Sequence, residues 1–198
     1  MMELVTIEGK AGSLEAHLEL QVQNSCCAVL CHPHPLYGGS MHDQVLTVLA
    51  QSMSSALVGT LAFNFRGVGA SEGCHDNGVG EVDDVVSAVE WLQREKGITS
   101  IVLCGYSFGA LMVLNALPRL EVEKAILVAP PVGRMSACKP EKIPMLVILG
   151  EEDEIVDSES TAAFFSSAEV HTIGAVDHFF VGAAGEIQAR VAGFMNGA

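Results

Sequence analysis

The sequence predicts an α/β protein whose mostly parallel β-sheet is covered by helices on both faces. Short β-rich runs alternate along the chain with segments of helix length, as in parallel strands joined by helical crossovers. The run Cys26–Cys31 is apolar throughout, which is typical of a strand buried on both faces of a sheet. Hydrophobic residues make up 49% of the 198 residues and charged residues only 17%, so the chain can fill a substantial core. This length suits one domain, which we expect to span residues 1–198.

The first half of the chain begins with an expected hairpin and continues as strand–helix units. Residues 2–7 and 12–20 flank a turn that contains Gly9 and Gly12, and they predict the two strands of this hairpin. The strand at 26–31 is followed by an expected helix over 42–57, a strand over 60–65 and a helix over 80–95. The last of these has apolar residues at helical spacing, namely Val82, Val85, Val86, Val89 and Leu92.

The second half repeats the alternation up to the C-terminus. The expected elements are a strand over 100–104, a helix over 108–117, strands over 124–129 and 145–149, a helix over 158–167, a strand over 169–173 and a final helix from about 183. In open parallel sheets, ligands bind at the carboxyl ends of the strands. We therefore expect the loops at these ends to carry the chemistry.

Charge and hydropathy exclude several classes of partner. The formal net charge is −14, so the chain lacks the positive surface that binds phosphate backbones or anionic lipids. No apolar run reaches the roughly 18 residues of a membrane-spanning helix. The first residues alternate and carry acids early, unlike a signal peptide. We expect a cytoplasmic protein that binds neither nucleic acid nor membranes.

The cysteines and the clustered histidines do not indicate a metal site. The six cysteines follow no zinc spacing, and reduced thiols are favoured over a disulfide framework or a metal site. His32 and His34, with His42 nearby, form the other possible ligand set, but a catalytic zinc needs a third ligand and an open position. We expect no metal and no cofactor.

A nucleophile candidate stands between the strand at 100–104 and the helix that follows it. Gly105, Ser107 and Gly109 form the pattern G-x-S-x-G, in which a strained strand-to-helix turn presents the serine hydroxyl. The helix N-terminus favours negative charge that develops there. A structural glycine-rich turn is the alternative. The strand before the pattern and the helix after it favour a nucleophile.

A serine needs a neighbouring base, and a base needs an acid to orient it. Two histidines lie beyond Ser107: His171 is inside an expected strand, whereas His178 follows the last one. His178 is therefore the predicted base. The segment 151–154 is entirely acidic, so charge alone does not identify the acid.

Five motifs in order give the chain a family resemblance. They are His32–Met41 (HPHPLYGGSM), Phe63–Gly73 (FNFRGVGASEG), the turn at Ser107, Gly150-x-x-Asp153-x-x-Val156 and Asp177–Phe180 (DHFF). The sequence resembles small bacterial serine hydrolases of the α/β-hydrolase superfamily that carry an HPHP oxyanion loop and are related to the dienelactone hydrolases. This implies an α/β-hydrolase fold with about eight strands and no lid domain, because only residues 130–144 separate two strands. Dienelactone hydrolases have cysteine where this chain has Ser107, which favours ordinary acyl substrates over dienelactone.

The resemblance also implies roles for individual residues. Asp153 matches the family's acid. The oxyanion hole would use the backbone N–H groups of Phe108 and, with His34-Pro35 aligned to the family's His-Gly pair, of Leu36, with Tyr37 as a second choice. Independently of the resemblance, Arg66 lies in the turn after the strand at 60–65 and is expected to be structural, with a place on the pocket rim as the alternative.

The implied activity is hydrolysis of small acyl esters at an open, shallow site. We expect the walls of this site to be formed by Leu36, Tyr37, Pro131, Val132 and Met135. The substrate would be a small acyl compound, and no cofactor is implied. A thioesterase, peptidase or acyltransferase with the same triad, or a non-catalytic binding protein with the hydrolase fold, remains the alternative.

Overall fold

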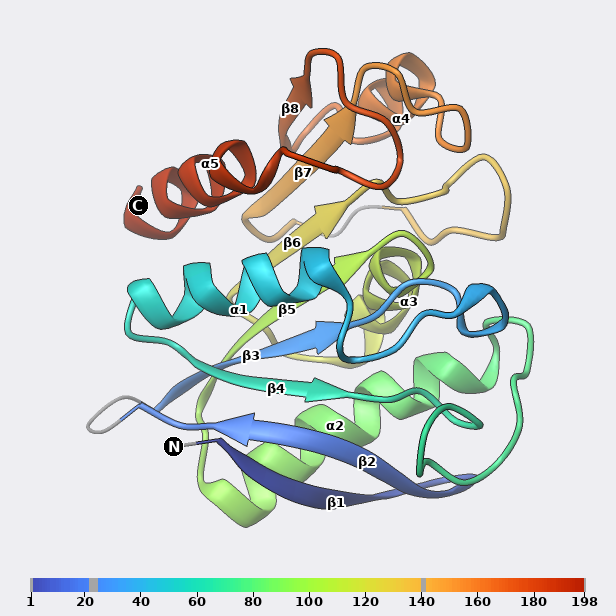
Figure 1. The fold of residues 1–198 in the computed structure, drawn as a ribbon. Coiled ribbons are helices and arrows are strands. Elements are labelled where there is room, and N and C mark those ends of the chain that lie inside the picture. Colours follow the sequence, from blue (N-terminus) through green and yellow to red (C-terminus); the bar gives the residue numbers. More distant parts are fainter. Residues whose placement is uncertain (1, 22–24, 140–141, 198) are drawn as a thin grey trace.

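An eight-stranded sheet organises the protein in the computed structural model, which describes residues 2–21, 25–139 and 142–197. The strand order is β1-β2-β4-β3-β5-β6-β7-β8 (Figure 1). The strands are β1 (Glu3–Gly9), β2 (Gly12–Glu19), β3 (Cys26–Cys31), β4 (Gly59–Phe63), β5 (Ser100–Tyr106), β6 (Lys124–Val128), β7 (Met145–Gly150) and β8 (Glu169–Ile173).

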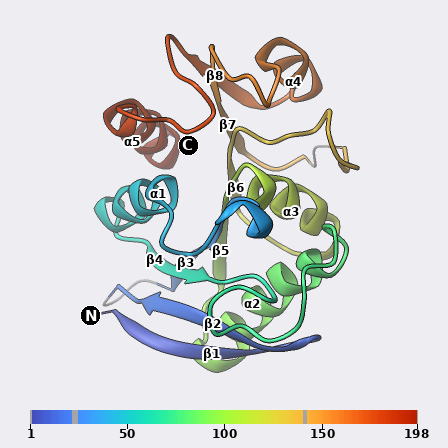
Figure 2. The same ribbon diagram turned by 45° about the vertical axis from the view of Figure 1, so that its right-hand side comes forward.

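Helices cover both faces of this sheet. Figure 2, which views the sheet nearly along its edge, shows α1 and α5 on one face and α2 and α3 on the other. Most of these helices bury an apolar side against the strands, and α3 is buried almost all round. The helices are α1 (Gln44–Ser55), α2 (Gly80–Lys96), α3 (Phe108–Ala116), α4 (Ser158–Phe164) and α5 (Ala184–Asn196), with short 3₁₀ turns at Pro35–Tyr37 and Leu117–Arg119.

The pairing of the strands brings distant loops together. β1 and β2 form the antiparallel edge, and β2 pairs antiparallel with β4. From β4 to β8 all neighbours are parallel. The carboxyl ends of β3, β5, β6, β7 and β8 therefore meet at one edge of the sheet, with β5 between β3 and β6.

The predicted fold class is confirmed, with small differences at the ends of elements. The first helix begins at Gln44 rather than 42, because the Asp43 carboxylate accepts the N–H groups of Val45 and Leu46 as its N-cap. The helix expected over 158–167 already ends at Phe164. The described part of the connection between β6 and β7, residues 130–139 and 142–144, contains no helix or strand that could form a lid. Among all described residues, no helix is long and apolar enough to cross a membrane.

A buried ion pair fixes the turn after β4. The Arg66 guanidinium donates to both carboxylate oxygens of Asp84 in α2, at 2.6–3.1 Å, and the Arg66 backbone N–H donates to the same carboxylate. Both side chains are buried, so the pair is well shielded from water. Arg66 therefore has the structural role expected for it.

Three of the four cysteines in the sheet, Cys27, Cys31 and Cys104, are buried in its core. Burial raises the pKa of the Cys27 thiol to about 12 and raises the pKa values of Cys31 and Cys104 still further. A thiol that stays protonated is a poor nucleophile and a poor metal ligand. These cysteines act as small hydrophobic residues.

Candidate active site

Ser107 occupies a strained turn between β5 and α3. Its φ is 51°, a left-handed conformation that serine adopts only when the surroundings impose it. A Cβ on Gly105 would lie 2.5 Å from the Gly109 carbonyl, and a Cβ on Gly109 would collide with the Cys31 carbonyl. The two glycines are thus required by close packing at the turn, which also brings the end of β3 against the start of α3.

Three side chains from three loops form a chain of hydrogen bonds. Ser107 Oγ lies 2.9 Å from His178 Nε2, and His178 Nδ1 lies 2.7 Å from Asp153 Oδ2. All three side chains are buried. The Tyr106 hydroxyl donates to the His178 carbonyl at 2.7 Å and holds the loop after β8 over the end of β5. The structure therefore brings together the residues predicted as nucleophile, base and acid.

Asp153 is held in its ionised form. Burial by itself raises the pKa of this carboxyl, but hydrogen bonds from His178, Val156 and Ile155 outweigh burial and keep the pKa below its usual value. The N–H groups of Ile155 and Val156 both donate to Oδ1 at 2.8 Å, which leaves Oδ2 for His178. An ionised Asp153 accepts a hydrogen bond from Nδ1–H and leaves Nε2 as the acceptor that faces Ser107.

The neighbouring acids and the second histidine lie away from this hydrogen-bond chain. Glu152 and Glu154 are both exposed on the same loop, and Glu151 accepts the Ala175 N–H at 3.1 Å. His171 pairs with Glu169 within β8, at 2.8 Å. Geometry thus distinguishes Asp153 from its acidic neighbours, which charge alone did not.

An open cavity of about 730 Å³ lies over Ser107. Tyr37, Pro131 and Met135 line it as expected, but Leu36 and Val132 do not. Leu36 is exposed on the outside of its turn, and Val132 is half-buried against the core. The lining residues that the sequence analysis missed are Pro33, His34, Gly38, Gly39, Asp43, Tyr106, Arg134, Ile155 and Phe179.

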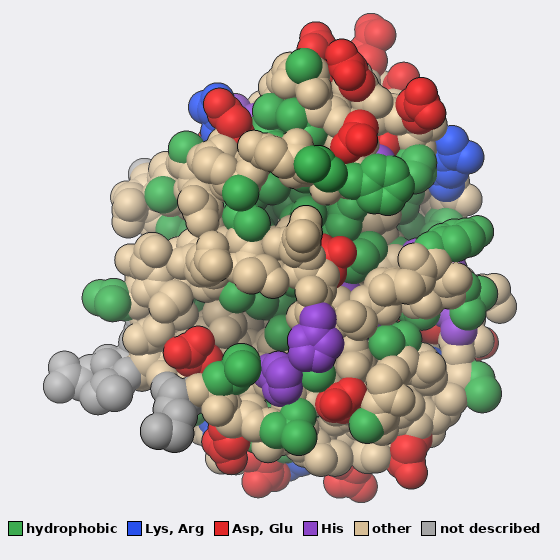
Figure 3. All heavy atoms as spheres, viewed as in Figure 1, with side chains coloured by type: hydrophobic (Ala, Val, Ile, Leu, Met, Phe, Trp, Pro, Cys, Tyr) green, Lys and Arg blue, Asp and Glu red, His purple; other side chains and the backbone are tan. Residues whose placement is uncertain are grey.

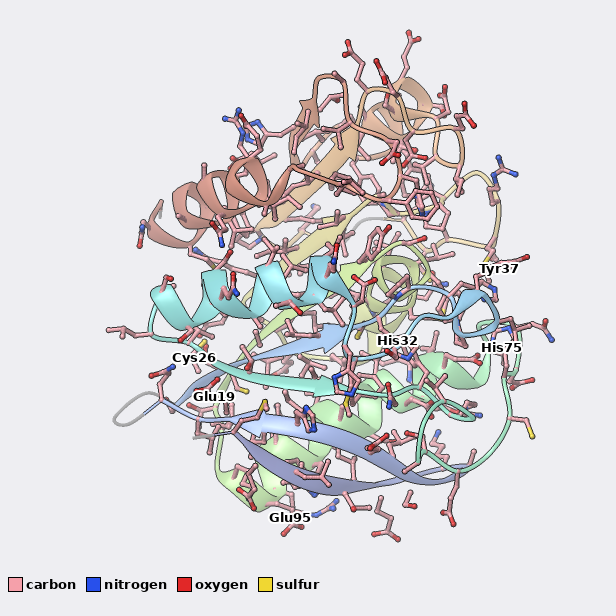
Figure 4. The ribbon with its side chains drawn as sticks, viewed as in Figure 1. Glu19, Cys26, His32, Tyr37, His75 and Glu95 are labelled. Atoms are coloured by element: carbon pink, nitrogen blue, oxygen red, sulfur yellow. The ribbon has the colours of Figure 1, made fainter. Side chains whose placement is uncertain are left out.

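The expectation for Leu36 as an oxyanion donor is corrected by its hydrogen bond. Its N–H donates to His34 Nδ1 at 3.2 Å, and the N–H of Tyr37, the second choice, donates to the His34 carbonyl at 3.1 Å. Both N–H groups are thus already engaged within the loop. Figure 4 shows Tyr37 at the outer end of this loop and His32 at its inner end, directly after β3.

His32 orients the peptide group between Pro33 and His34. A carbonyl can only accept, so the 2.6 Å contact with the Pro33 oxygen places the ring proton on His32 Nδ1, while Nε2 accepts the Phe65 N–H at 3.0 Å. The peptide bond is trans, so its N–H points away from the carbonyl that His32 holds. Pro33 and His34 both line the cavity, as does Phe108. Within the described residues, the N–H groups of His34 and Phe108 have no protein acceptor.

The same hydrogen bonds leave His32 without a nitrogen for a metal ion. Both of its ring nitrogens are engaged, and His34 Nδ1 accepts the Leu36 N–H. The described part of the chain contains no group of three or more His, Cys, Asp or Glu side chains that could hold a metal ion. The residues present therefore do not fit a metal centre at His32 and His34.

Buried His32 makes stability depend on pH. Burial lowers its pKa to about 4, so the folded protein keeps the ring neutral while the unfolded chain takes up a proton below about pH 6.5. The contribution of neutral His32 to the free energy of unfolding is therefore fully present above pH 6.5 and is lost as the pH decreases toward 4. The total loss is about 3 kcal/mol, because each tenfold change in proton affinity corresponds to about 1.4 kcal/mol.

Urea unfolding at pH 7 and pH 4.5 measures this contribution. His32→Asn keeps an amide donor near the Nδ1 position but cannot titrate, so its free energy of unfolding should fall less than that of the wild type over the same range. Equal losses in both proteins would contradict a neutral buried imidazole.

The fold and the site together define a class of protein: an α/β hydrolase in which a buried serine, histidine and aspartate are hydrogen-bonded in sequence. Residues 39–141 match the family model for the alpha/beta hydrolase fold, and the chain belongs to this family. It is also 32% identical over 196 residues to an uncharacterized protein of Rickettsia prowazekii, a match that covers 90% of this chain and 82% of the relative.

Two solved structures are similar over nearly their full length. A serine hydrolase without a lid from Xanthomonas campestris has a TM-score of 0.92 and 30% identity, covering 98% of this chain and 93% of the other. An alpha-beta serine hydrolase homologue from Coxiella burnetii has a TM-score of 0.89 and 34% identity, covering 96% and 95%. The chain is thus similar in sequence and fold to proteins described as serine hydrolases.

Proposed function

We propose that this protein is a serine esterase that cleaves small carboxylic esters through an acyl-enzyme intermediate. The observation that carries the proposal is the continuous hydrogen-bond chain from Ser107 through His178 to Asp153, which opens into a cavity lined by His34 and Phe108. This arrangement contains a nucleophile, a base and an orienting acid, beside backbone N–H groups that suit an oxyanion site.

The residues act in a defined order in this mechanism. His178 Nε2 takes the proton of Ser107 as Oγ bonds to the ester carbonyl carbon. The carbon–oxygen bond to the alcohol then breaks, and His178 returns the proton to the departing alcohol. Water, deprotonated by the same imidazole, attacks the carbonyl carbon of the acyl-serine. The bond to Ser107 Oγ then breaks, His178 returns the proton to Oγ, and the acid is released. Asp153 remains ionised and orients His178 throughout.

The N–H groups of Phe108 and His34 bind the negative oxygen of the tetrahedral intermediate. Phe108 is the first residue of α3, so its N–H has no acceptor within the helix. The His34 N–H takes the place first expected for Leu36. Both donors belong to rigid backbone, so little reorganisation is required when charge develops on the substrate.

The oxyanion assignment predicts a kinetic effect at a residue that does not touch the substrate. In His32→Leu the Pro33 carbonyl loses its donor, and we expect kcat to fall roughly 10²- to 10³-fold, as when one oxyanion donor is lost. KM should change little. His32→Asn retains a donor and should recover most of kcat, as measured with p-nitrophenyl acetate. Unchanged kcat in His32→Leu would show that His32 only supports the fold.

Covalent labelling tests the proposed function directly. A fluorophosphonate probe should add to Ser107, as located by peptide mass spectrometry, and p-nitrophenyl acetate should be hydrolysed. A panel of matched esters, thioesters and amides then ranks the acyl substrates. A folded protein that neither reacts with the probe nor cleaves any member of the panel would refute the proposal.

A further inference from the structure

Two aromatic side chains stand exposed at the mouth of the cavity. Tyr37 is 88% exposed and Phe179 is 65% exposed, and both line the cavity that contains Ser107. Figure 3 shows hydrophobic side chains gathered on the right of the face in view, around the carboxyl ends of the strands. Large apolar side chains that adjoin a cavity commonly mark a binding surface. Because these rings are continuous with the site of Ser107, the substrate itself is the occupant that fits them.

The two rings contact different histidines of the site. The Tyr37 ring packs on the imidazole of His34, with ring centres 4.8 Å apart. The Phe179 ring stands 5.9 Å from the His178 imidazole, almost perpendicular to it at 83°. His178 returns a proton to the alcohol oxygen, so that oxygen must lie next to this imidazole during the reaction. The group attached to the alcohol oxygen therefore extends toward Phe179.

The backbone holds Phe179 in place although its side chain is exposed. The Phe179 N–H donates to Asp177 Oδ1 at 3.0 Å, and the Phe180 N–H donates to the Asp177 carbonyl at 3.3 Å. The next side chain, Phe180, is buried in the core and anchors the turn. With the backbone held in this way, a ring that has only two side-chain torsions binds a flat apolar group without much loss of conformational entropy.

The cavity that Phe179 lines is mostly apolar, which favours an apolar group. Ile155 lines the same cavity and is 41% exposed. The acidic and basic side chains of the lining are Asp43 and Arg134, and Asp43 already accepts two N–H groups at the start of α1. Arg134 donates through Nε to the Ile155 carbonyl at 2.8 Å.

We propose that Phe179 forms a leaving-group subsite, and that the substrates are esters of aromatic or bulky apolar alcohols with a small acyl group. This inference rests on the proposed esterase function and specifies which side of the ester is recognised. Phe179 contacts the alcohol only until the carbon–oxygen bond breaks. It therefore acts on acylation and has no effect on the hydrolysis of the acyl-serine.

A pair of isomeric esters tests this assignment. In 2-naphthylmethyl acetate the naphthyl group is on the alcohol side, and in methyl 2-naphthylacetate it is on the acyl side. For Phe179→Ala we expect kcat/KM to fall about five- to tenfold with the first ester, which is the effect of losing one aromatic contact, and to stay within about twofold with the second. Phe179→Tyr keeps the ring and should restore activity. Val181→Ala is the matched control, since Val181 is also exposed on this loop but does not line the cavity.

The outcomes separate the subsite from the esterase function. Equal losses with both isomers, or a loss confined to the acyl-side isomer, would overturn the leaving-group subsite while fluorophosphonate labelling of Ser107 still supports the esterase. A changed rate of acetyl-serine hydrolysis in Phe179→Ala would overturn it as well. Absence of both labelling and hydrolysis in the wild type would refute the esterase and the subsite together.

Discussion

Ser107→Ala should abolish fluorophosphonate labelling and lower kcat for p-nitrophenyl acetate by roughly 10⁶-fold, the effect seen when a serine nucleophile is removed from a triad. The reason is local: the substitution removes Oγ and leaves His178, Asp153 and the two oxyanion N–H groups in place. Residual hydrolysis above the uncatalysed rate should remain, because the proposed oxyanion site is left intact and would still bind the substrate. Stopped-flow and long-time assays together cover this range of rates.

Two variants show that the loss arises from the nucleophile and not from the fold. Ser107→Gly removes the side chain from a position with φ of 51°, where glycine is less strained than serine. This variant should therefore unfold at a higher temperature than the wild type and be as inactive as Ser107→Ala. Ser166→Ala changes an exposed serine that does not line the cavity and should keep full activity. Labelling that persists in Ser107→Ala would place the reactive group elsewhere.

Much of the fold could be predicted because the local patterns agree with the tertiary structure. The apolar run Cys26–Cys31 had to be a strand buried on both faces, and the valines of α2 define one apolar side of a helix. Ser107 and His178 could be placed because each follows a strand whose carboxyl end lies at the active edge of the sheet. Asp153 needed the family resemblance, since nothing local separates it from Glu152 and Glu154.

The loop after β3 shows why the oxyanion donor and parts of the cavity lining could not be predicted from the sequence. His-Pro occurs twice, at residues 32–33 and 34–35, and the two alignments differ by two residues. The proposed oxyanion site corresponds to the first alignment, in which His32 directly follows the end of β3 at Cys31 and accepts the Phe65 N–H just past the end of β4. Phe179 and Ile155 were missed for a related reason: a cavity wall depends on how loops from distant parts of the chain approach one another.

Asp153→Asn is expected to have the second large effect on catalysis. The oxygen of the introduced amide can still accept the N–H groups of Ile155 and Val156, but the amide NH₂ group would then face His178 Nδ1. A donor at that position stabilises the tautomer with the proton on Nε2, which cannot accept the proton of Ser107. We expect kcat to fall about 10⁴-fold with KM little changed, as for the same substitution in other triads.

The acids beside Asp153 supply the comparison that makes this result decisive. Glu152→Gln and Glu154→Gln remove the same charge within one residue of Asp153, yet neither side chain is part of the hydrogen-bond chain to Ser107. If Asp153 acted only through general negative charge, all three variants would lose similar activity. If it acts by fixing the tautomer of His178, only Asp153→Asn is impaired, and its labelling by the fluorophosphonate slows in parallel with kcat. The ratio of kcat between Asp153→Asn and Glu154→Gln therefore measures how much of the rate depends on one oriented hydrogen bond.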